Sequence, residues 1–124
     1  MAKSVNDVVL DGALNVIKMG ATQQIACSAE PTTYAQATGT YSLSVQAMAT
    51  GTDYVIADDA SGRKVTVGAK TGATVINSGT ANHVALVNNG GGVLLYVTTC
   101  TPQYVAPGNT VNFGSWKINI QDPT

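Results

Sequence analysis

From Gly20 onward the sequence is a succession of short β-prone runs separated by turn residues, and this pattern constrains the fold more than any other feature. We count about nine runs at the spacing typical of a β-sandwich or barrel. They cover residues 23–28, 41–49, 52–57, 63–69, 72–79, 81–87, 93–100, 103–113 and 115–120. The predicted fold is therefore mainly β, a compact antiparallel β-sandwich or barrel-like domain.

Alternation of apolar and polar residues within several runs indicates strands with one face in the core. The run 41–49 places two sets of side chains on opposite faces, namely Leu43, Val45, Ala47 and Ala49 against Ser42, Ser44, Gln46 and Met48. The last run does the same, with Trp116, Ile118 and Ile120 against Ser115, Lys117 and Asn119. We expect the first set of each run to face the core.

The segment from Ala81 to Thr101 predicts a hairpin whose tip is Asn88, Asn89 and three consecutive glycines. The second arm differs from the other runs because residues 93–97 are apolar on both faces. Strands covered on both sides read as continuous apolar runs, so we expect 93–97 to form the central strand of a sheet.

The N-terminal part of the chain has a helical period instead. Ser4 and Asp7 fit a capping box, and Gly20 stands where a glycine would end a helix. Apolar side chains at helical spacing follow the cap, namely Val9, Leu10, Ala13, Leu14 and Ile17. We expect one helix over residues 5–19. The alternative is a hairpin that turns at Asp11-Gly12, because a glycine costs a helix interior about 1 kcal/mol.

Length and composition indicate one domain over residues 1–124 with an unusual surface. The chain shows no composition break and no Pro-rich linker, and it is long enough to bury a core without disulfides or metals. Charged residues make up 10% of the chain, whereas a soluble domain carries about 25%. A surface made of Thr, Ser, Asn and Gln repels neighbouring molecules weakly, so it suits a protein that ends in contact with others.

Charge and hydropathy argue against nucleic acid and membranes as partners. The formal net charge is −1, and the six cations form no basic stripe. No apolar run approaches the roughly 18 residues of a membrane span. The start "MAKSVNDVVLDG" has no apolar core of a signal peptide, so we expect synthesis and folding in a cytoplasm.

Residue types that carry chemistry are few and scattered. His83 is the only histidine, and nothing in the sequence places it beside a nucleophile. One histidine and two separated cysteines do not make a zinc site. The acidic residues near Gly62 (Asp53, Asp58 and Asp59) lack the spacing of a calcium loop. We predict that the protein is not an enzyme and that it needs no cofactor or metal.

The two cysteines, Cys27 and Cys100, lie far apart in sequence and outside any CxxC motif. We interpret them as buried small side chains. A disulfide between two neighbouring strands is the alternative.

Candidate contact residues lie mainly in loops. Residues 29–40 read as a polar loop in which Glu30-Pro31 prevents helix continuation. Tyr34 in this loop and Tyr104 in a later one are either interface or core-edge residues. Arg63 and Lys64 either neutralise Asp58 and Asp59 across a hairpin or reach an acidic patch on a partner. The candidate interface residues are therefore Glu30, Pro31, Tyr34, Arg63, Lys64 and Tyr104.

Segments along nearly the whole chain resemble a family of small proteins encoded by tailed bacteriophages. They are "CSAEPTTYAQAT" (27–38), "SGRKVTV" (61–67), "SGTANHVALV" (78–87), "LLYVTTCT" (94–101), "GNTVNF" (108–113) and "WKINIQDPT" (116–124). Members of the family look like virion components, so the resemblance implies a structural protein of the virion that is made in the cytoplasm of a bacterial host. It carries over no catalytic or ligand-binding residue.

Among virion roles, we expect a capsid decoration, or cement, protein that binds the assembled head as a trimer. Its partners would be other copies of itself and the major capsid protein or another virion protein. Such a role needs a small β-rich body, symmetric contacts and a surface that can be buried without stranding charges. The alternatives are a tail or neck component and a host-surface binding module presented by the loops around Tyr34 and Tyr104.

Overall fold

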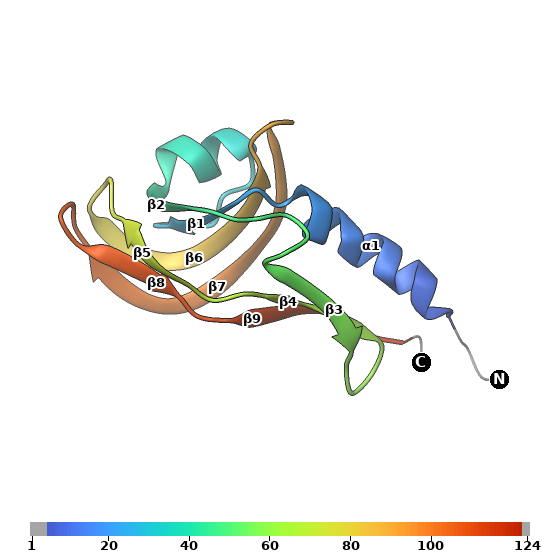
Figure 1. Cartoon of the computed structure of the whole chain (residues 1–124). Helices are drawn as coiled ribbons and strands as arrows, with labels where there is room; N and C mark the ends of the chain where they lie inside the picture. Colours follow the sequence, from blue (N-terminus) through green and yellow to red (C-terminus); the bar gives the residue numbers. More distant parts are fainter. Residues whose placement is uncertain (1–4, 123–124) are drawn as a thin grey trace.

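The computed structural model describes residues 5–122 and confirms a mainly β fold with one N-terminal α-helix (Figure 1). The helix α1 is Asp7–Gly20. Nine strands lie within the described residues: β1 Gln23–Cys27, β2 Ser42–Ala47, β3 Tyr54–Asp58, β4 Arg63–Val67, β5 Lys70–Thr74, β6 Gly79–Asn88, β7 Val93–Val105, β8 Thr110–Phe113 and β9 Trp116–Ile120. A π-helical turn, η1, spans Gln36–Thr40.

The strands form three antiparallel sheets. Sheet A has the order β2-β1-β6-β7, sheet B has the order β3-β4-β9, and sheet C pairs β5 with β8. In sheet A, Ile25 of β1 lies opposite Val45 of β2 on one side and Ala85 of β6 on the other. The β6–β7 hairpin is the predicted one, and Asn88 pairs with Val93 at its tip.

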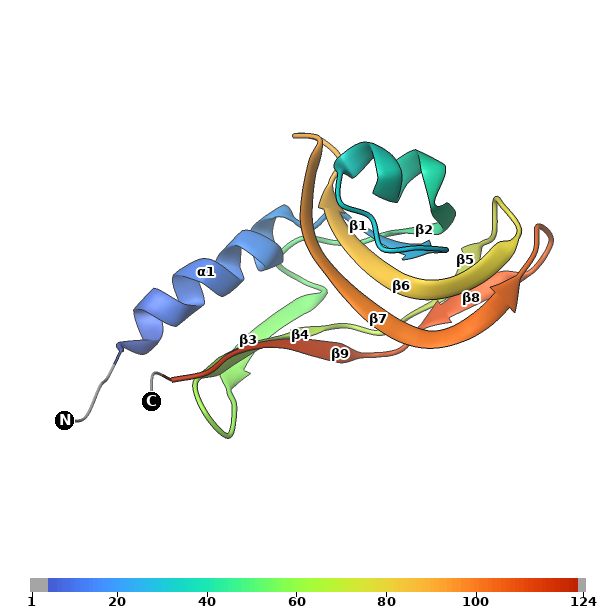
Figure 2. The ribbon, with the colours of Figure 1, turned by 180° about the vertical axis from the view of Figure 1, so that it is seen from behind.

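The sheets follow one another as an incomplete barrel. A single bridge between Ser44 and Val75 joins β2 of sheet A to sheet C, and Gly114 and Ser115 connect β8 to β9 of sheet B. In the described part of the chain no ladder joins β7 to β8. Figure 2 shows β6 and β7 curving beneath the helical segment around η1, with sheet C beside one end of the two strands. The fold is therefore a compact β-rich body and not a closed barrel.

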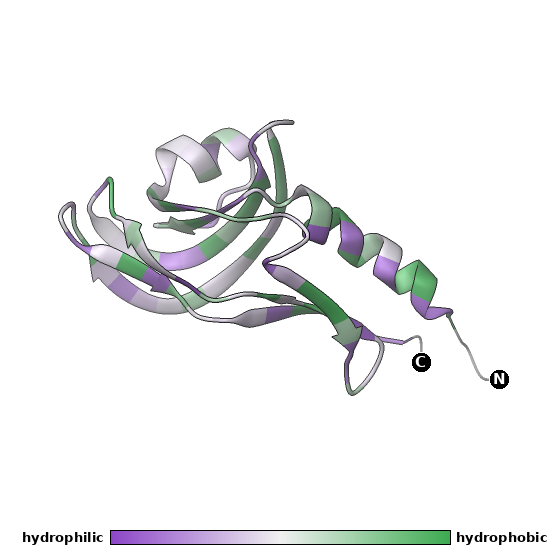
Figure 3. Ribbon diagram, in the orientation of Figure 1, coloured by the Kyte–Doolittle hydropathy of each residue, from purple (hydrophilic) through white to green (hydrophobic). Residues whose placement is uncertain are grey.

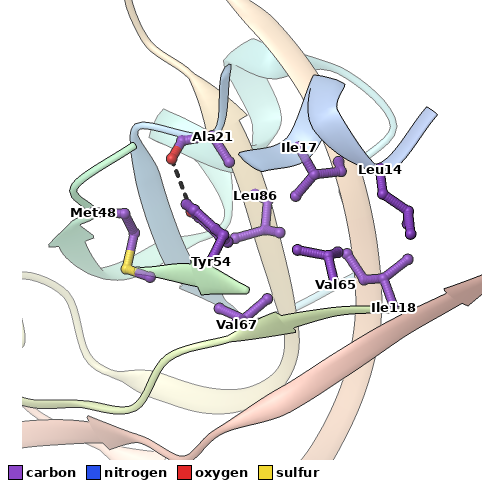
Figure 4. Close-up of a cluster of buried hydrophobic side chains, with 9 residues drawn as sticks. All are labelled: Leu14, Ile17, Ala21, Met48, Tyr54, Val65, Val67, Leu86 and Ile118. Carbon is purple, nitrogen blue, oxygen red and sulfur yellow. Dashed lines mark hydrogen bonds between the residues drawn. The ribbon is translucent and has the colours of Figure 1, made fainter. Parts of the chain in front are cut away.

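The first core cluster lies between α1, sheet B and one face of sheet A (Figure 4). Leu14 and Ile17 of α1 meet Val65 of β4 and Leu86 of β6. The ring of Tyr54 is buried in the same cluster, and its hydroxyl donates to the carbonyl of Ala21 at 2.8 Å. This cluster fixes the helix on the sheets.

Two further clusters bury both faces of sheet A. On the face toward sheet C, Ala26 and Val84 pack with Phe113. On the opposite face, Ile25 and Ala85 pack under the helical segment that follows Thr33. Sheet A is thus a middle layer, with the helical segment on one side and sheets B and C on the other.

The helix confirms the predicted helical period and excludes the hairpin at Asp11-Gly12. The predicted capping residue Ser4 lies outside the described residues, and the N-cap is Asn6, whose side chain accepts a hydrogen bond from the amide of Val8 at 2.9 Å. The helix includes Gly20 and is capped by Ala21, so the predicted glycine terminator is wrong by one position.

The prediction that residues 93–97 form a central strand is wrong. β7 is an edge strand, and β1 and β6 occupy the centre of sheet A. Pro102 within β7 is compatible with this edge position, since proline cannot donate to a ladder. The apolar residues in the first half of β7 pack on both faces of sheet A. Leu95 packs against the first core cluster, and Val97 packs against the cluster under the helical segment.

The predicted faces of the run 41–49 are correct only in part. Ser42, Leu43 and Ser44 are all buried, because β2 lies between the helical segment and sheet C. Beyond the strand, Met48 is buried and the neighbouring Ala47 is exposed, which reverses the expected pattern. In β9 the expected alternation holds: Ile118 is buried and Lys117 is exposed.

Candidate interaction surfaces

The thiols and the histidine do not form a nucleophilic pair. Cys27 lies opposite His83 in the ladder between β1 and β6, but its Sγ is directed to the carbonyls of Ile25 (3.8 Å) and Ala37 (3.9 Å). The Nδ1 of His83 lies 2.7 Å from the Oδ1 of Asn82. Burial, and after it the charge of Cys100, raises the pKa of Cys27 to about 12. A nucleophilic cysteine needs the opposite shift of its pKa.

Both cysteines are free thiols. Cys27 is fully buried and Cys100 is half-buried, so the interpretation of two small packed side chains describes Cys27 well and Cys100 less well. Within residues 5–122, no group of three His, Cys, Asp or Glu side chains could hold a metal ion.

A groove of about 550 Å³ lies at the gap in the incomplete barrel, between β7 and the segment that joins β8 to β9. Thr98 and Thr101 of β7 line one wall, and Phe113 lines the other. At its inner end, Trp116 donates from Nε1 to the Oε1 of the buried Gln24 at 2.8 Å. Main-chain groups of an edge strand and threonine hydroxyls can bind the backbone of an extended segment. The groove was not predicted from the sequence.

A charged cluster connects the β3–β4 hairpin to α1. The Nε of Arg63 lies 2.8 Å from the Oδ1 of Asp11, and its Nη1 lies 2.8 Å from the Oδ1 of Asp58. The hydrogen bonds to Asp11 and then to Asp58 raise the pKa of Arg63. The Nζ of Lys117, rather than a group on the hairpin, lies 2.7 Å from the Oδ2 of Asp59 and lowers the pKa of that carboxyl. Neutralisation across the hairpin is thus confirmed for Arg63 with Asp58.

The candidate interface residues lie in three separate regions. Glu30 is exposed, Pro31 is buried and Tyr34 is half-buried beside the tip of the β6–β7 hairpin, where a Cβ on Gly92 would lie 4.0 Å from its ring. Tyr104 pairs with Thr80 at the other end of that hairpin. The third region is the β3–β4 hairpin, which carries Arg63 and Lys64. The structure therefore does not bring the six residues together on one surface.

Two of these residues differ from the prediction in their local structure. Tyr104 is in a strand and not in a loop, and it is 67% exposed. Residues 29–40 are not an irregular loop throughout, because Tyr34 begins a helical turn that continues into η1. Thr33 caps this turn by accepting from the amide of Gln36 at 3.1 Å. The pattern Thr33-x-x-Gln36 is the signal in the sequence that could have revealed it.

The surface also carries a set of large apolar side chains, of which only Tyr104 was among the interface residues predicted from the sequence. Half of them lie on α1, and the others lie on or beside strands of all three sheets. They are Val8, Val9, Val16 and Met19 on α1, Val55 on β3, Ile76 after β5, and Val93 and Tyr104 on β7. Figure 3 shows apolar segments recurring along the length of α1. The signal for the helical set was the sequence of α1, in which apolar residues fill more than the single face that packs on the core.

Comparisons of the chain with models of known protein families, with curated proteins and with solved structures found no match. Among the described residues, no helix has the length and apolar character that a membrane crossing requires.

Proposed function

We propose that this protein is a structural component of a bacteriophage virion, and specifically a capsid decoration protein that binds the outside of the assembled head. The observation that carries the proposal is the exposed apolar surface. Among residues 5–122 eight large apolar residues are exposed, four of them on α1, and only 10% of the full sequence is charged. The four on α1 lie along one helix, and contiguous exposed apolar area marks surfaces that bind other proteins.

The compact body supports this role over that of a tail-tube subunit. The segment over residues 29–40 folds back on sheet A, where Ala37 is buried against Ile25 and Cys27. It is therefore not an extended arm that reaches a neighbouring subunit. A small body that contributes several contact surfaces fits a position between capsomers, where each copy meets both sister copies and the shell.

The partners that follow are other copies of this chain, arranged as a trimer, and the major capsid protein or another virion protein. The neutral surface favours such contacts because few charges would be stranded when it is buried. The charges of Arg63 and Asp11 already neutralise each other within the chain, so burying them costs less than burying free charges.

Cryo-electron microscopy of virions with and without this protein tests the role. We expect protrusions on the capsid surface that disappear when the protein is absent. Loss of density confined to the tail or neck would reject decoration and select the alternative virion role. Purified protein added to particles that lack it should restore the protrusions.

A binding assay separates the virion role from a host-surface module. We expect the purified protein to sediment with particles that lack it and to remain in solution with purified bacterial envelope. The opposite result would select the host-surface module, and substitution of Tyr34 or Tyr104 should then weaken binding to the envelope. These two tyrosines lie at opposite ends of the β6–β7 hairpin, so a single compact receptor site could not use both.

A further inference from the structure

The helix α1 has a second apolar face that points away from the core. Its inner face consists of Leu10, Leu14 and Ile17, which are buried. The outer face has its own seam of residues spaced three, four and three positions apart, namely Val9, Gly12, Val16 and Met19. This is the spacing with which one helix packs along another. A helix that is apolar on both faces is expected to be covered on both.

The outer seam is exposed and uncharged. Val9, Val16 and Met19 are 63%, 57% and 63% exposed, and the flanking Val8 is 75% exposed. The charged residues of the helix, Asp7, Asp11 and Lys18, follow one stripe on its other side because they are spaced by four and seven positions. Within that stripe, Asp11 forms an ion pair with Arg63. No charge of α1 therefore opposes the approach of an apolar partner to the seam.

Gly12 in the middle of the seam gives an independent indication. A glycine in a helix interior costs about 1 kcal/mol relative to alanine. A Cβ at Gly12 would meet no atom within 4 Å, so no contact among residues 5–122 requires the glycine. A glycine on a helix surface does allow the backbone of another helix to approach closely. A partner helix at this position would explain why residue 12 is glycine, whereas contacts within the isolated chain do not.

We infer that the outer seam of α1 is the surface through which copies of this chain associate, and that its occupant is the α1 helix of a second copy. The four exposed side chains present apolar area on the order of 400 Å² per copy, which is typical of interaction patches. Two copies would bury roughly 800 Å² from these side chains, and the flanking residues would bring the total near the roughly 1,000 Å² of a specific interface. A second copy supplies an identical seam.

A lipid surface fits the seam less well than a second copy. Helices that lie on membranes carry Lys and Arg beside the apolar face, whereas α1 has one lysine and two aspartates. The inference rests on the self-association that the proposed function requires, but not on the capsid as a partner.

The test compares Val16→Glu with Val55→Glu by analytical ultracentrifugation of the full chain over a range of concentrations. The two valines are almost equally exposed, at 57% and 59%, but Val55 is on β3. We expect the wild type and Val55→Glu to sediment as a multiple of the 12.7 kDa chain and Val16→Glu as a monomer. A monomeric wild type, or a Val16→Glu variant that associates like the wild type, would overturn the inference.

Gly12→Leu excludes misfolding as the reason for a loss of association. Leucine is a better helix former than glycine, and the space around Gly12 is open, so this variant should be at least as helical as the wild type. We expect its dissociation constant to rise at least about tenfold, because the added side chain prevents close approach of the helices. Unchanged association of this variant would contradict the inference.

The outcomes also separate this inference from the proposed function. Association in solution without binding to particles would remove the decoration role alone. Binding to particles by a chain that stays monomeric in solution and in the bound state would remove the α1 inference alone. A monomeric wild type that floats with vesicles of phosphatidylcholine and phosphatidylglycerol would overturn the inference in favour of a lipid surface.

Discussion

Gln24 is a fully buried polar side chain, and its partners lie on distant parts of the chain. Its Oε1 accepts from the Nε1 of Trp116 on β9, 92 positions later, and its Nε2 approaches the sulfur of Met48 at 3.7 Å. Trp116 also stacks on Tyr96 of β7, with ring centroids 5.9 Å apart. This small polar network links sheet A to sheet B beside the groove.

Trp116→Phe should destabilise the fold by about 1–3 kcal/mol, because the Oε1 of Gln24 would stay buried without a donor. The measurement is the free energy of unfolding in urea. The same substitution in a Gln24→Leu background should cost clearly less, since no buried acceptor is then left unpaired. Equal losses in both backgrounds would show that packing against Tyr96, and not the hydrogen bond, accounts for the effect.

The raised pKa of Cys27 predicts that the folded protein loses stability in alkaline solution. Burial, and then the charge of Cys100, raises its pKa in the folded state to about 12 from 9.0. The unfolded chain therefore releases this proton first as the pH rises. The contribution of the Cys27 thiol to the free energy of unfolding is complete below about pH 9 and is lost progressively toward pH 12. We expect the free energy of unfolding to fall over this range.

Cys27→Ala is the variant that tests this pH dependence. It should reduce the slope of stability against pH above 9, whatever it does to stability at neutral pH. Some slope should remain, because burial and then the charge of Asp53 also raise the pKa of Tyr54. An unchanged slope in Cys27→Ala would contradict the assignment.

At the scale of the elements, a glycine allows the β3–β4 hairpin to lie close to the backbone at the end of β9. Gly62 has φ +77°, and a Cβ there would lie 1.9 Å from the carbonyl oxygen of Ile120. Gly72 in β5 has nearly the same φ, +79°, but a Cβ there would meet nothing within 4 Å. The two glycines therefore share the conformational requirement and differ in the space around them.

Gly72→Ala should cost about 1–2 kcal/mol, which is the strain of a left-handed conformation. Gly62→Ala should cost at least about 1 kcal/mol more, because the backbone of β9 must also move. Thermal or urea unfolding of the two variants measures the difference. Equal losses would mean that the C-terminal end of β9 yields freely to the added methyl group.

Strand and helix positions were predictable because they depend on local patterns. The hairpin from Ala81 to Thr101 and the helix with its buried Leu10, Leu14 and Ile17 follow from turn residues and periodicity. The place of a strand within its sheet depends on partners that local apolar content does not identify. Pro102 is a local sign against a central position for β7, whereas the apolar run before it, on which the prediction rested, is not specific to a central strand.

The candidate surfaces were less predictable than the elements. Loops and tyrosines were the basis for the six candidate interface residues, and the fold distributes these residues over three regions. The groove forms only when β7 and β8, which are adjacent in sequence, fail to pair. The outer seam of α1 consists of apolar residues, but the helical period alone places Val9 on the same face as Leu10, and only burial in the fold distinguishes the two.

For the whole molecule, we expect the sheets of the incomplete barrel to differ in local stability. β1 and β6 are paired on both sides within sheet A and are covered on both faces by core clusters. Sheet C has two strands, and its register is broken between Lys70 and Ala73. The opening beside β8 leaves this sheet with less support from its neighbours than sheet A receives.

Amide hydrogen exchange should follow this division. We expect the amides of β1 and β6 to exchange most slowly and those of β5 and β8 to exchange fastest among the strands, because opening sheet C breaks few hydrogen bonds and leaves sheet A intact. Amides on the outer side of β7 should also exchange quickly, since they face the groove. The measurement is hydrogen exchange by mass spectrometry or NMR on the wild type and on Gly12→Leu at the same concentration. The comparison separates protection by the fold from protection by self-association. Equal protection of β8 and β1 in both proteins would show that the body unfolds as one cooperative unit, with the gap between β7 and β8 having no effect on local stability.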